Sequence, residues 1–216
     1  MALKVNVTKA TQRQSLSLNT SKAETVTVFL NWSGSADLDL HALFACQTPN
    51  GAKVTDFDEI LSTYNVIRKV RENGQMVEVG TLPLNPDGTF GIFNGALLHS
   101  KDALNGDAGT DDEWIKINPS LFPARSAPIE IPLVAMIHNQ PPNNKTFADI
   151  TDAAVKVVSS TGNVLLDVSL TGQEFAGYNG VQLGAFTIDP NNGSLVFVTQ
   201  VSVFKGEFNA VLEVYS

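Results

Sequence analysis

Short stretches in which apolar and polar residues alternate recur along almost the whole chain. Clear examples are residues 25–32 (TVTVFLNW), 128–134 (PIEIPLV) and 195–204 (LVFVTQVSVF). A period of two places successive side chains on opposite faces of a strand, whereas a helix has a period near 3.6. Many short strands and few helical signals predict an all-β fold, specifically an antiparallel two-sheet β-sandwich with a few short helices.

Turn residues separate these stretches and predict which of them pair. Asn-Gly, which tolerates the positive φ of tight hairpins, occurs at Asn50, Asn73, Asn94, Asn105, Asn179 and Asn192. We expect three hairpins, over residues 75–93, 155–168 and 184–200, the first with NPDG (85–88) as its turn. Helical signals are limited to 56–70, which could open with a helix, and 146–153, which could hold a turn or two. Residues 209–216 (NAVLEVYS) alternate and predict a further strand.

The segment from His99 to Glu113 is strongly acidic and has no hydrophobic run. Its five carboxylates are Asp102, Asp107, Asp111, Asp112 and Glu113. Such crowding is relieved by a hard cation, and Ca²⁺, which takes six to eight oxygen ligands in a flexible geometry, suits it best. The segment is not an EF-hand loop, because Leu104, Gly106 and Asp107 occupy positions three, five and six. The alternative is a solvated acidic loop that binds no ion.

A second acidic pair lies in the DLDL segment at 37–40. In a strand, Asp37 and Asp39 point to the same face and Leu38 and Leu40 to the other. One interpretation is an edge strand whose acidic face is open to water. The other is that the acidic loop folds against this face, so that the pair completes one or two calcium sites with Asp111, Asp112 and Glu113.

The order of these motifs resembles that of the TerD family of tellurium-resistance and general stress proteins. The shared order is a strand ending in Trp32, DLDL, HSKDALNG (99–106), DDE (111–113) and a strand ending in Ile-His (137–138). Residues 5–18, 146–170 and 183–200 resemble the family's opening strand, its later strand pair and its last hairpin.

The resemblance implies a single TerD-like β-sandwich domain over residues 1–216 that binds calcium. It also implies that Asn94, at the polar position before the HS motif, adds a side-chain oxygen to the metal site. The chain departs from the family in two places. An excursion at about 53–87 is longer than usual, and the acid that normally stands just before DDE lies further back, at Asp107.

Composition and missing motifs narrow the function. The net charge of −8 argues against nucleic acid or an anionic membrane as a partner. The chain has neither a long apolar run nor the apolar core of a signal peptide, which predicts a cytoplasmic protein without membrane insertion. It contains no nucleophile elbow, zinc-protease motif or phosphate loop, so we expect no enzyme. His41, His99 and His138 are too far apart in sequence to predict a zinc site.

Two classes of function stay open. The first is a calcium-binding stress-response module of the TerD type, for tellurium, phage or other stress, that acts by binding or scaffolding. The alternative is a structural or assembly protein, such as a virion or surface-lattice subunit, that reuses the sandwich. In both cases we expect protein partners, through self-assembly or in a complex.

Overall fold

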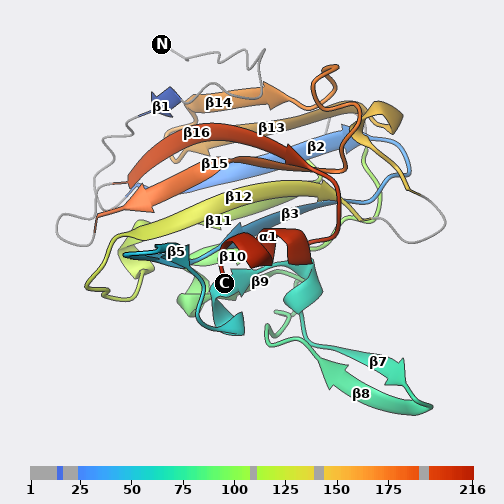
Figure 1. Cartoon of the computed structure of the whole chain (residues 1–216), viewed down its shortest axis with the longest axis horizontal. Helices are drawn as coiled ribbons and strands as arrows, with labels where there is room; N and C mark the ends of the chain where they lie inside the picture. The colour runs from blue at the N-terminus through green and yellow to red at the C-terminus, as the bar shows by residue number, and fades with distance from the viewer. Residues whose placement is uncertain (1–13, 17–23, 108–110, 139–143, 190–194) are drawn as a thin grey trace.

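The computed structural model describes residues 14–16, 24–107, 111–138, 144–189 and 195–216, whose strands form two packed antiparallel sheets and a separate two-stranded hairpin (Figure 1). The strand order of the first sheet is β1-β16-β15-β12-β3-β6, with β4 added beside β12 and β5 beside β4. Its strands are β1 (Gln14–Leu16), β3 (Leu38–Leu43), β4 (Ala45–Thr48), β5 (Gly51–Lys53), β6 (Ile60–Leu61), β12 (Ile129–Ile137), β15 (Gly180–Ile188) and β16 (Leu195–Phe204). The predicted antiparallel sandwich is confirmed.

The second sheet has the order β14-β13-β2-β11-β10-β9. Its strands are β2 (Val26–Ser33), β9 (Phe90–Ile92), β10 (Leu97–His99), β11 (Glu113–Ile117), β13 (Thr151–Ser159) and β14 (Val164–Ser169). In β2, Val26, Val28, Leu30 and Trp32 are fully buried and the residues between them are half-buried. The alternation seen in the sequence therefore marks the face that meets the first sheet, and one continuous apolar cluster fills the space between the sheets.

Helices are few and short, as predicted. They are the 3₁₀ turns η1 (Phe57–Glu59), η2 (Thr63–Asn65), η3 (Phe93–Gly95), η4 (Pro119–Leu121) and η5 (Phe147–Asp149), and the α-helix α1 (Asn209–Val214). The prediction of a strand at 209–216 is wrong, because α1 occupies most of this segment. Val211 and Tyr215 are four residues apart, so a helix places both on one face, where they join Leu43, Val134 and Met136 in a second apolar cluster. Burial against the sheet therefore outweighs the alternating pattern.

Two of the three predicted hairpins are confirmed. β13 pairs with β14 and β15 pairs with β16, although residues 190–194, which connect the second pair, lie outside the described residues. The third is wrong. β8 (Gln75–Val79) pairs with β7 (Arg68–Glu72) through the Asn73-Gly74 turn, whose φ angles are 49° and 84°. The NPDG turn does form, with Asn85 N–H donating to Thr89 O at 2.8 Å, but it leads into β9, which pairs with β10. β8 thus pairs across the two-residue Asn-Gly turn with β7, and not across the NPDG turn with β9.

Candidate metal centre

Three carboxylates from two segments distant in sequence meet at one end of β3. They are Asp37, just before the strand, Asp39 within it, and Asp102, which follows β10; one oxygen of each lies within 4.8 Å of the others. We call these three residues the carboxylate cluster. β6 pairs only with Ala42 and Leu43, but all six residues of β3 are buried, so the interpretation of DLDL as a strand whose acidic face is open to water is wrong. Asp39 itself is only 2% exposed.

Glu113 holds the segment that carries Asp102 against β3. Its side chain is fully buried at the start of β11, in the second sheet. One carboxylate oxygen accepts a hydrogen bond from Leu40 N in the first sheet at 2.9 Å, and the other accepts one from Ala103 N at 3.2 Å. Burial, and then the charge of Asp39, raises the pKa of Glu113 well above its usual value. This predicted ligand therefore connects the two sheets from inside the sandwich.

Asp112 connects the acidic loop to the end of β2 through hydrogen bonds. Its carboxylate accepts hydrogen bonds from Trp32 N at 3.0 Å and from Asp107 N at 2.9 Å. Gly34 and Gly106 exchange two backbone hydrogen bonds of 3.2 and 3.0 Å, and a Cβ on Gly106 would lie 2.5 Å from Trp32 O, so only glycine fits this close approach. The loop is thereby fastened to the end of β2.

Asp107, Asp111 and Asn94 are not members of the carboxylate cluster. Asp107 and Asp111 are exposed, and residues 108–110 between them are outside the described residues. Asn94 is exposed in η3, before β10, whereas Asp102 follows β10 at the opposite end of that strand. Among the residues that the structure describes, no second group of three acidic, histidine or cysteine side chains comes as close together. The structure therefore brings together Asp37, Asp39 and Asp102 from the eight predicted residues.

The electrostatics of the cluster favour a bound cation. Burial, followed by the charges of Asp39 and Asp102, raises the pKa of Asp37 from 3.8 to about 6. Burial and the charge of Asp39 also raise the pKa of Asp102. Burial acts in the same direction on Asp39, but interactions with His138 and Thr63 outweigh it and leave the pKa below its usual value. Asp37 and Asp102 therefore stay close to the ionised Asp39 at the expense of their own charged forms.

The residues present fit a calcium ion. Asp37 Oδ1 is buried and accepts no hydrogen bond, and the buried Asp39 Oδ2 has only the ring of His138 beside it, with Nδ1 at 3.5 Å. Buried polar atoms nearly always have a partner, and a cation would supply one for Asp37 Oδ1 and add one to Asp39 Oδ2. Three carboxylates offer only oxygen ligands, the type that Ca²⁺ prefers, and the exposed side of Asp102 leaves room for water to complete the six to eight ligands it takes.

Sequence reasoning missed the residues that surround Asp39. Thr63 Oγ1, from η2, donates a hydrogen bond to Asp39 Oδ1 at 2.8 Å, and His138 Nδ1, at the end of β12, lies 3.5 Å from Asp39 Oδ2. His41 is fully buried against Tyr64, with a ring distance of 5.4 Å, and burial lowers its pKa to about 4. Only the pairing of β12 with β3, where Met136 lies opposite Asp39, brings His138 here. A single sequence carries no signal of that register.

Comparison with known proteins identifies the relatives of this chain. The family model described as TerD domain matches residues 3–213. General stress protein 16U of Bacillus subtilis (strain 168) is 34% identical over 70 residues, which make up 32% of this chain and 35% of that protein. The match thus spans about a third of that relative's length.

Two solved structures share the fold. A homologue of telluride resistance protein (TerD) from Streptomyces coelicolor A3(2) has a TM-score of 0.60 at 19% identity, covering 90% of this chain and 98% of its own. A protein of unknown function has a TM-score of 0.59 at 15% identity, covering 89% and 96%. At these identities the likeness shows the fold alone. In the described part of the chain, no helix is long and apolar enough to cross a membrane.

Proposed function

The chain belongs to the TerD family, and from this membership and the carboxylate cluster we propose that it is a calcium-binding stress-response module. It acts by binding or scaffolding and not by catalysis. The observation that carries the calcium assignment is the meeting of three carboxylates within 4.8 Å, one of whose oxygens, Asp37 Oδ1, is buried and accepts no hydrogen bond. One relative is named for general stress and another for telluride resistance, and neither name is that of a virion or lattice protein.

Calcium has a structural part in this proposal. The three cluster residues come from two segments, one leading into β3 in the first sheet and one leaving β10 in the second. An ion shared by Asp39 and Asp102 would join the sheets beside Glu113, which already connects Leu40 to Ala103. Binding to the folded state alone stabilises it by about 2.7 kcal/mol at a hundredfold excess over Kd.

Calcium is favoured over magnesium on geometric grounds. Mg²⁺ demands near-ideal octahedral geometry and gives up water reluctantly, whereas Ca²⁺ accepts irregular sets of carboxylates. The cluster is irregular, because Asp39 is held in a strand and Asp102 in a loop. The stress that the protein answers, its protein partners and its cytoplasmic location stay predictions.

Calorimetric titration with calcium tests the proposal. We expect heat of binding with the wild-type protein, and loss of that heat in Asp39→Asn and in Asp102→Asn. Glu78→Gln is the matched control, because it removes an exposed carboxylate on β8, far from the cluster. A wild-type protein that gives no heat, or variants that bind as tightly as the wild type, would remove the calcium assignment.

A further inference from the structure

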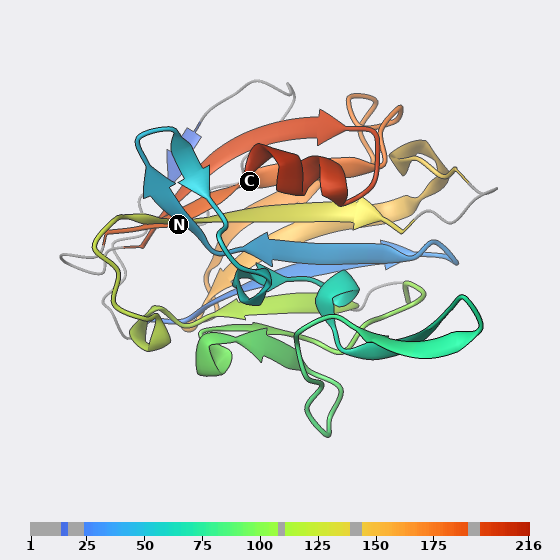
Figure 2. The ribbon, with the colours of Figure 1, turned by 60° about the horizontal axis from the view of Figure 1, so that its bottom comes forward.

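The β7–β8 hairpin is the feature of the excursion at 53–87 that the proposed function does not use. We call residues 68–79 the arm. It projects from the sandwich into solvent, as Figures 1 and 2 show from two directions, and it pairs only within itself as a separate two-stranded sheet. An isolated two-stranded hairpin is marginally stable in water, so an arm of this kind needs support at its base or along its length.

The base of the arm is held firmly. Val66 and Leu82, on either side of it, are buried in the main apolar cluster, and Ile67 N donates a hydrogen bond to Leu82 O at 2.8 Å. Gly80 crosses Val66 at the base with a φ of +86°, where a Cβ would lie 2.3 Å from Val66 O. This tight crossing fixes the direction in which the arm leaves the body, so the arm presents a defined surface.

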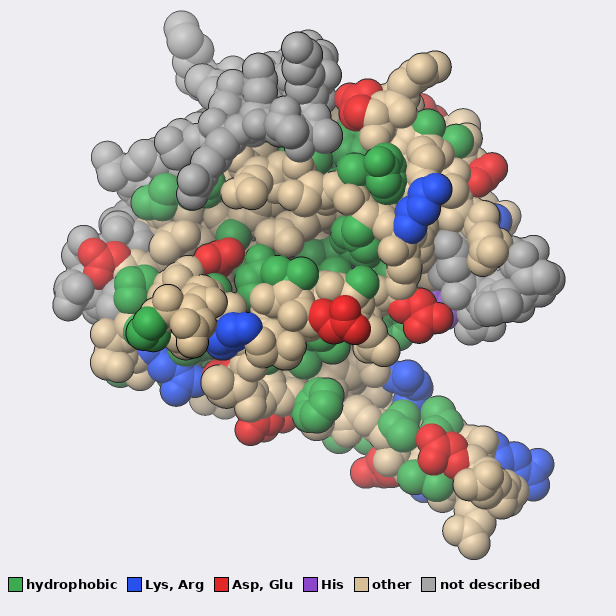
Figure 3. Space-filling model, viewed as in Figure 1, with side chains coloured by type: hydrophobic (Ala, Val, Ile, Leu, Met, Phe, Trp, Pro, Cys, Tyr) green, Lys and Arg blue, Asp and Glu red, His purple; other side chains and the backbone are tan. Residues whose placement is uncertain are grey.

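The register of the arm gives it two different faces. Val70 lies opposite Val77 on one face, and this pair stiffens the ribbon itself. On the other face Lys69 lies opposite Glu78, and Arg71 lies opposite Met76. We call this second set the Met76 face; all four of its side chains are exposed, Met76 by 63%. Methionine and arginine are enriched at protein interfaces, and Figure 3 shows apolar, acidic and basic side chains on the projecting arm.

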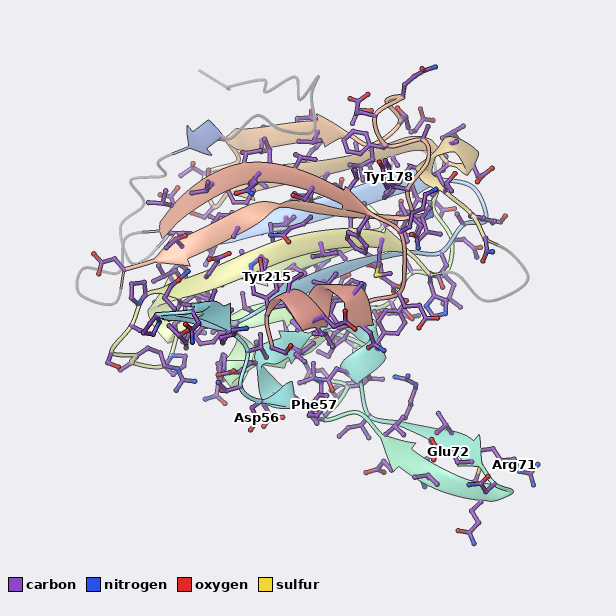
Figure 4. The ribbon with its side chains drawn as sticks, viewed as in Figure 1. Asp56, Phe57, Arg71, Glu72, Tyr178 and Tyr215 are labelled. Carbon is purple, nitrogen blue, oxygen red and sulfur yellow. The ribbon has the colours of Figure 1, made fainter. Side chains whose placement is uncertain are left out.

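An apolar groove lies between α1 and the segment that contains η1. Its volume is about 400 Å³, and the residues that line it include Val54, Asp56, Phe57, Ile60, Leu212 and Tyr215. Phe57 is 64% exposed at its edge, and Figure 4 shows Asp56 and Phe57 on the side of the molecule from which the arm extends. Asp56 and the exposed Asp58 make this edge acidic. The groove thus offers an apolar surface for the exposed Met76 and an acidic edge for Lys69 and Arg71, which outnumber the one acid of the Met76 face, Glu78.

We propose that the arm of each molecule docks in the groove of a second copy of this chain, forming a reciprocal two-fold dimer. Met76 enters the apolar groove, and Lys69 and Arg71 face Asp56 and Asp58. The excursion at 53–87 supplies both halves of the contact, the arm itself and the η1 side of the groove. A molecule that lacked the excursion would lack both.

The groove lies at the base of the arm, and this position allows two copies to exchange arms about a two-fold axis. Asn65, at the base of the arm, donates from its side chain to Phe57 O at 2.8 Å, so the groove begins where the arm begins. The arm's own tip, with Arg71 and Glu72, lies at the far end in Figure 4 and points away from that groove. Each strand of the arm is roughly 17 Å long. Two arms placed antiparallel about a two-fold axis therefore bring each tip to the groove of the other copy.

Sedimentation velocity over a range of concentrations tests this dimer. We expect the wild-type chain to form dimers, and we expect Met76→Glu and Phe57→Glu each to weaken dimerisation at least tenfold. Both side chains are exposed, so the variants should fold, which a thermal melt verifies. Leu121→Glu is the matched control: it places the same charge at another exposed apolar residue, in η4, and should leave the dimer intact.

A mixing experiment separates this arrangement from other dimers. Met76→Glu keeps an intact groove and Phe57→Glu keeps an intact arm, so an equimolar mixture retains one of the two contacts. We expect dimers to reappear in the mixture and not in either variant alone. A wild-type chain that sediments as a monomer at every concentration, a dimer that both variants leave unchanged, or a mixture that stays monomeric would each overturn the proposal.

Discussion

The carboxylate cluster and the arm are built in opposite ways. The cluster joins residues more than sixty positions apart in sequence, places acids whose charges repel side by side, and depends on backbone contacts made by Glu113. The arm is local: a two-residue turn and adjacent strands define it, and its side chains face water. The comparison teaches that changes at the cluster should alter stability and ion binding, whereas changes on the arm should alter association and leave folding almost untouched.

The largest effect should come from the residue that supports the cluster. We expect Glu113→Ala to lower the free energy of unfolding by roughly 4 kcal/mol, because two backbone N–H groups, of Leu40 and Ala103, lose their partner. Urea unfolding in the presence of a chelator measures this directly. Glu78→Ala, on the arm, should change the same quantity by less than about 0.5 kcal/mol. A loss below about 1 kcal/mol in Glu113→Ala would show that these hydrogen bonds do not support the cluster.

Calcium itself should have the next largest effect. At a hundredfold excess over Kd we expect calcium to stabilise the wild-type protein by about 2.7 kcal/mol, which raises Tm by roughly 5 to 10 °C in a chain of this size. Asp102→Asn should abolish the increase, while Arg71→Glu on the arm should keep it. Differential scanning calorimetry in calcium and in chelator gives both values. An equal Tm in the two conditions would argue against a metal site that stabilises the fold.

On the arm, reversing one charge should act on association alone. We expect Arg71→Glu to weaken the dimer at least tenfold, equivalent to about 1.4 kcal/mol, because a carboxylate then faces the acidic edge formed by Asp56 and Asp58. Sedimentation equilibrium measures the change. Asp102→Asn should leave the dimer unchanged, since the cluster lies outside the contact. If Asp102→Asn weakened the dimer as much as Arg71→Glu, the two regions would not be independent.

The smallest effect is a difference in pH dependence. The pKa of Asp37 is raised from 3.8 to about 6 in the folded state, so the folded protein binds this proton more tightly than the unfolded chain does. Without calcium, Asp37 alone should therefore make the protein about 1 kcal/mol more stable at pH 5 than at pH 7. His41, with its pKa lowered to about 4, acts in the opposite direction, so the comparison must be with Asp37→Asn.

Two measurements check this sign. In chelator, the free energy of unfolding of Asp37→Asn should rise less, or fall more, between pH 7 and pH 5 than that of the wild type. In the presence of calcium, protons compete for the same carboxylate, so the wild-type affinity should fall as the pH drops through 6. Identical pH profiles for the two proteins would mean that Asp37 is ionised throughout.

The sequence was most informative where its signals are local. Alternation in β2 predicted which residues enter the core, and the DLDL spacing placed Asp37 and Asp39 on one side. The strand predicted at 209–216 failed because Val211 and Tyr215 gain more burial as one face of a helix. Asn73-Gly74 was recognised as a turn signal, yet the NPDG turn was preferred for the pairing of β8.

The surroundings of Asp39 show what one sequence does not contain. Thr63 and His138 approach it from a short 3₁₀ turn and from the end of a neighbouring strand. Neither belongs to an acidic motif, and both depend on strand order and register. The charge of Glu113 predicted a metal ligand, whereas its contacts with Leu40 and Ala103 follow from the packing of one sheet on the other.

The hydrogen bond from Leu40 N to Glu113 makes one amide proton a probe of the contact between the two sheets. That N–H lies in one sheet and its acceptor in the other, so it exchanges with deuterium only when the sheets separate or slide at this end. Hydrogen exchange at Leu40 therefore records how often the sandwich opens there.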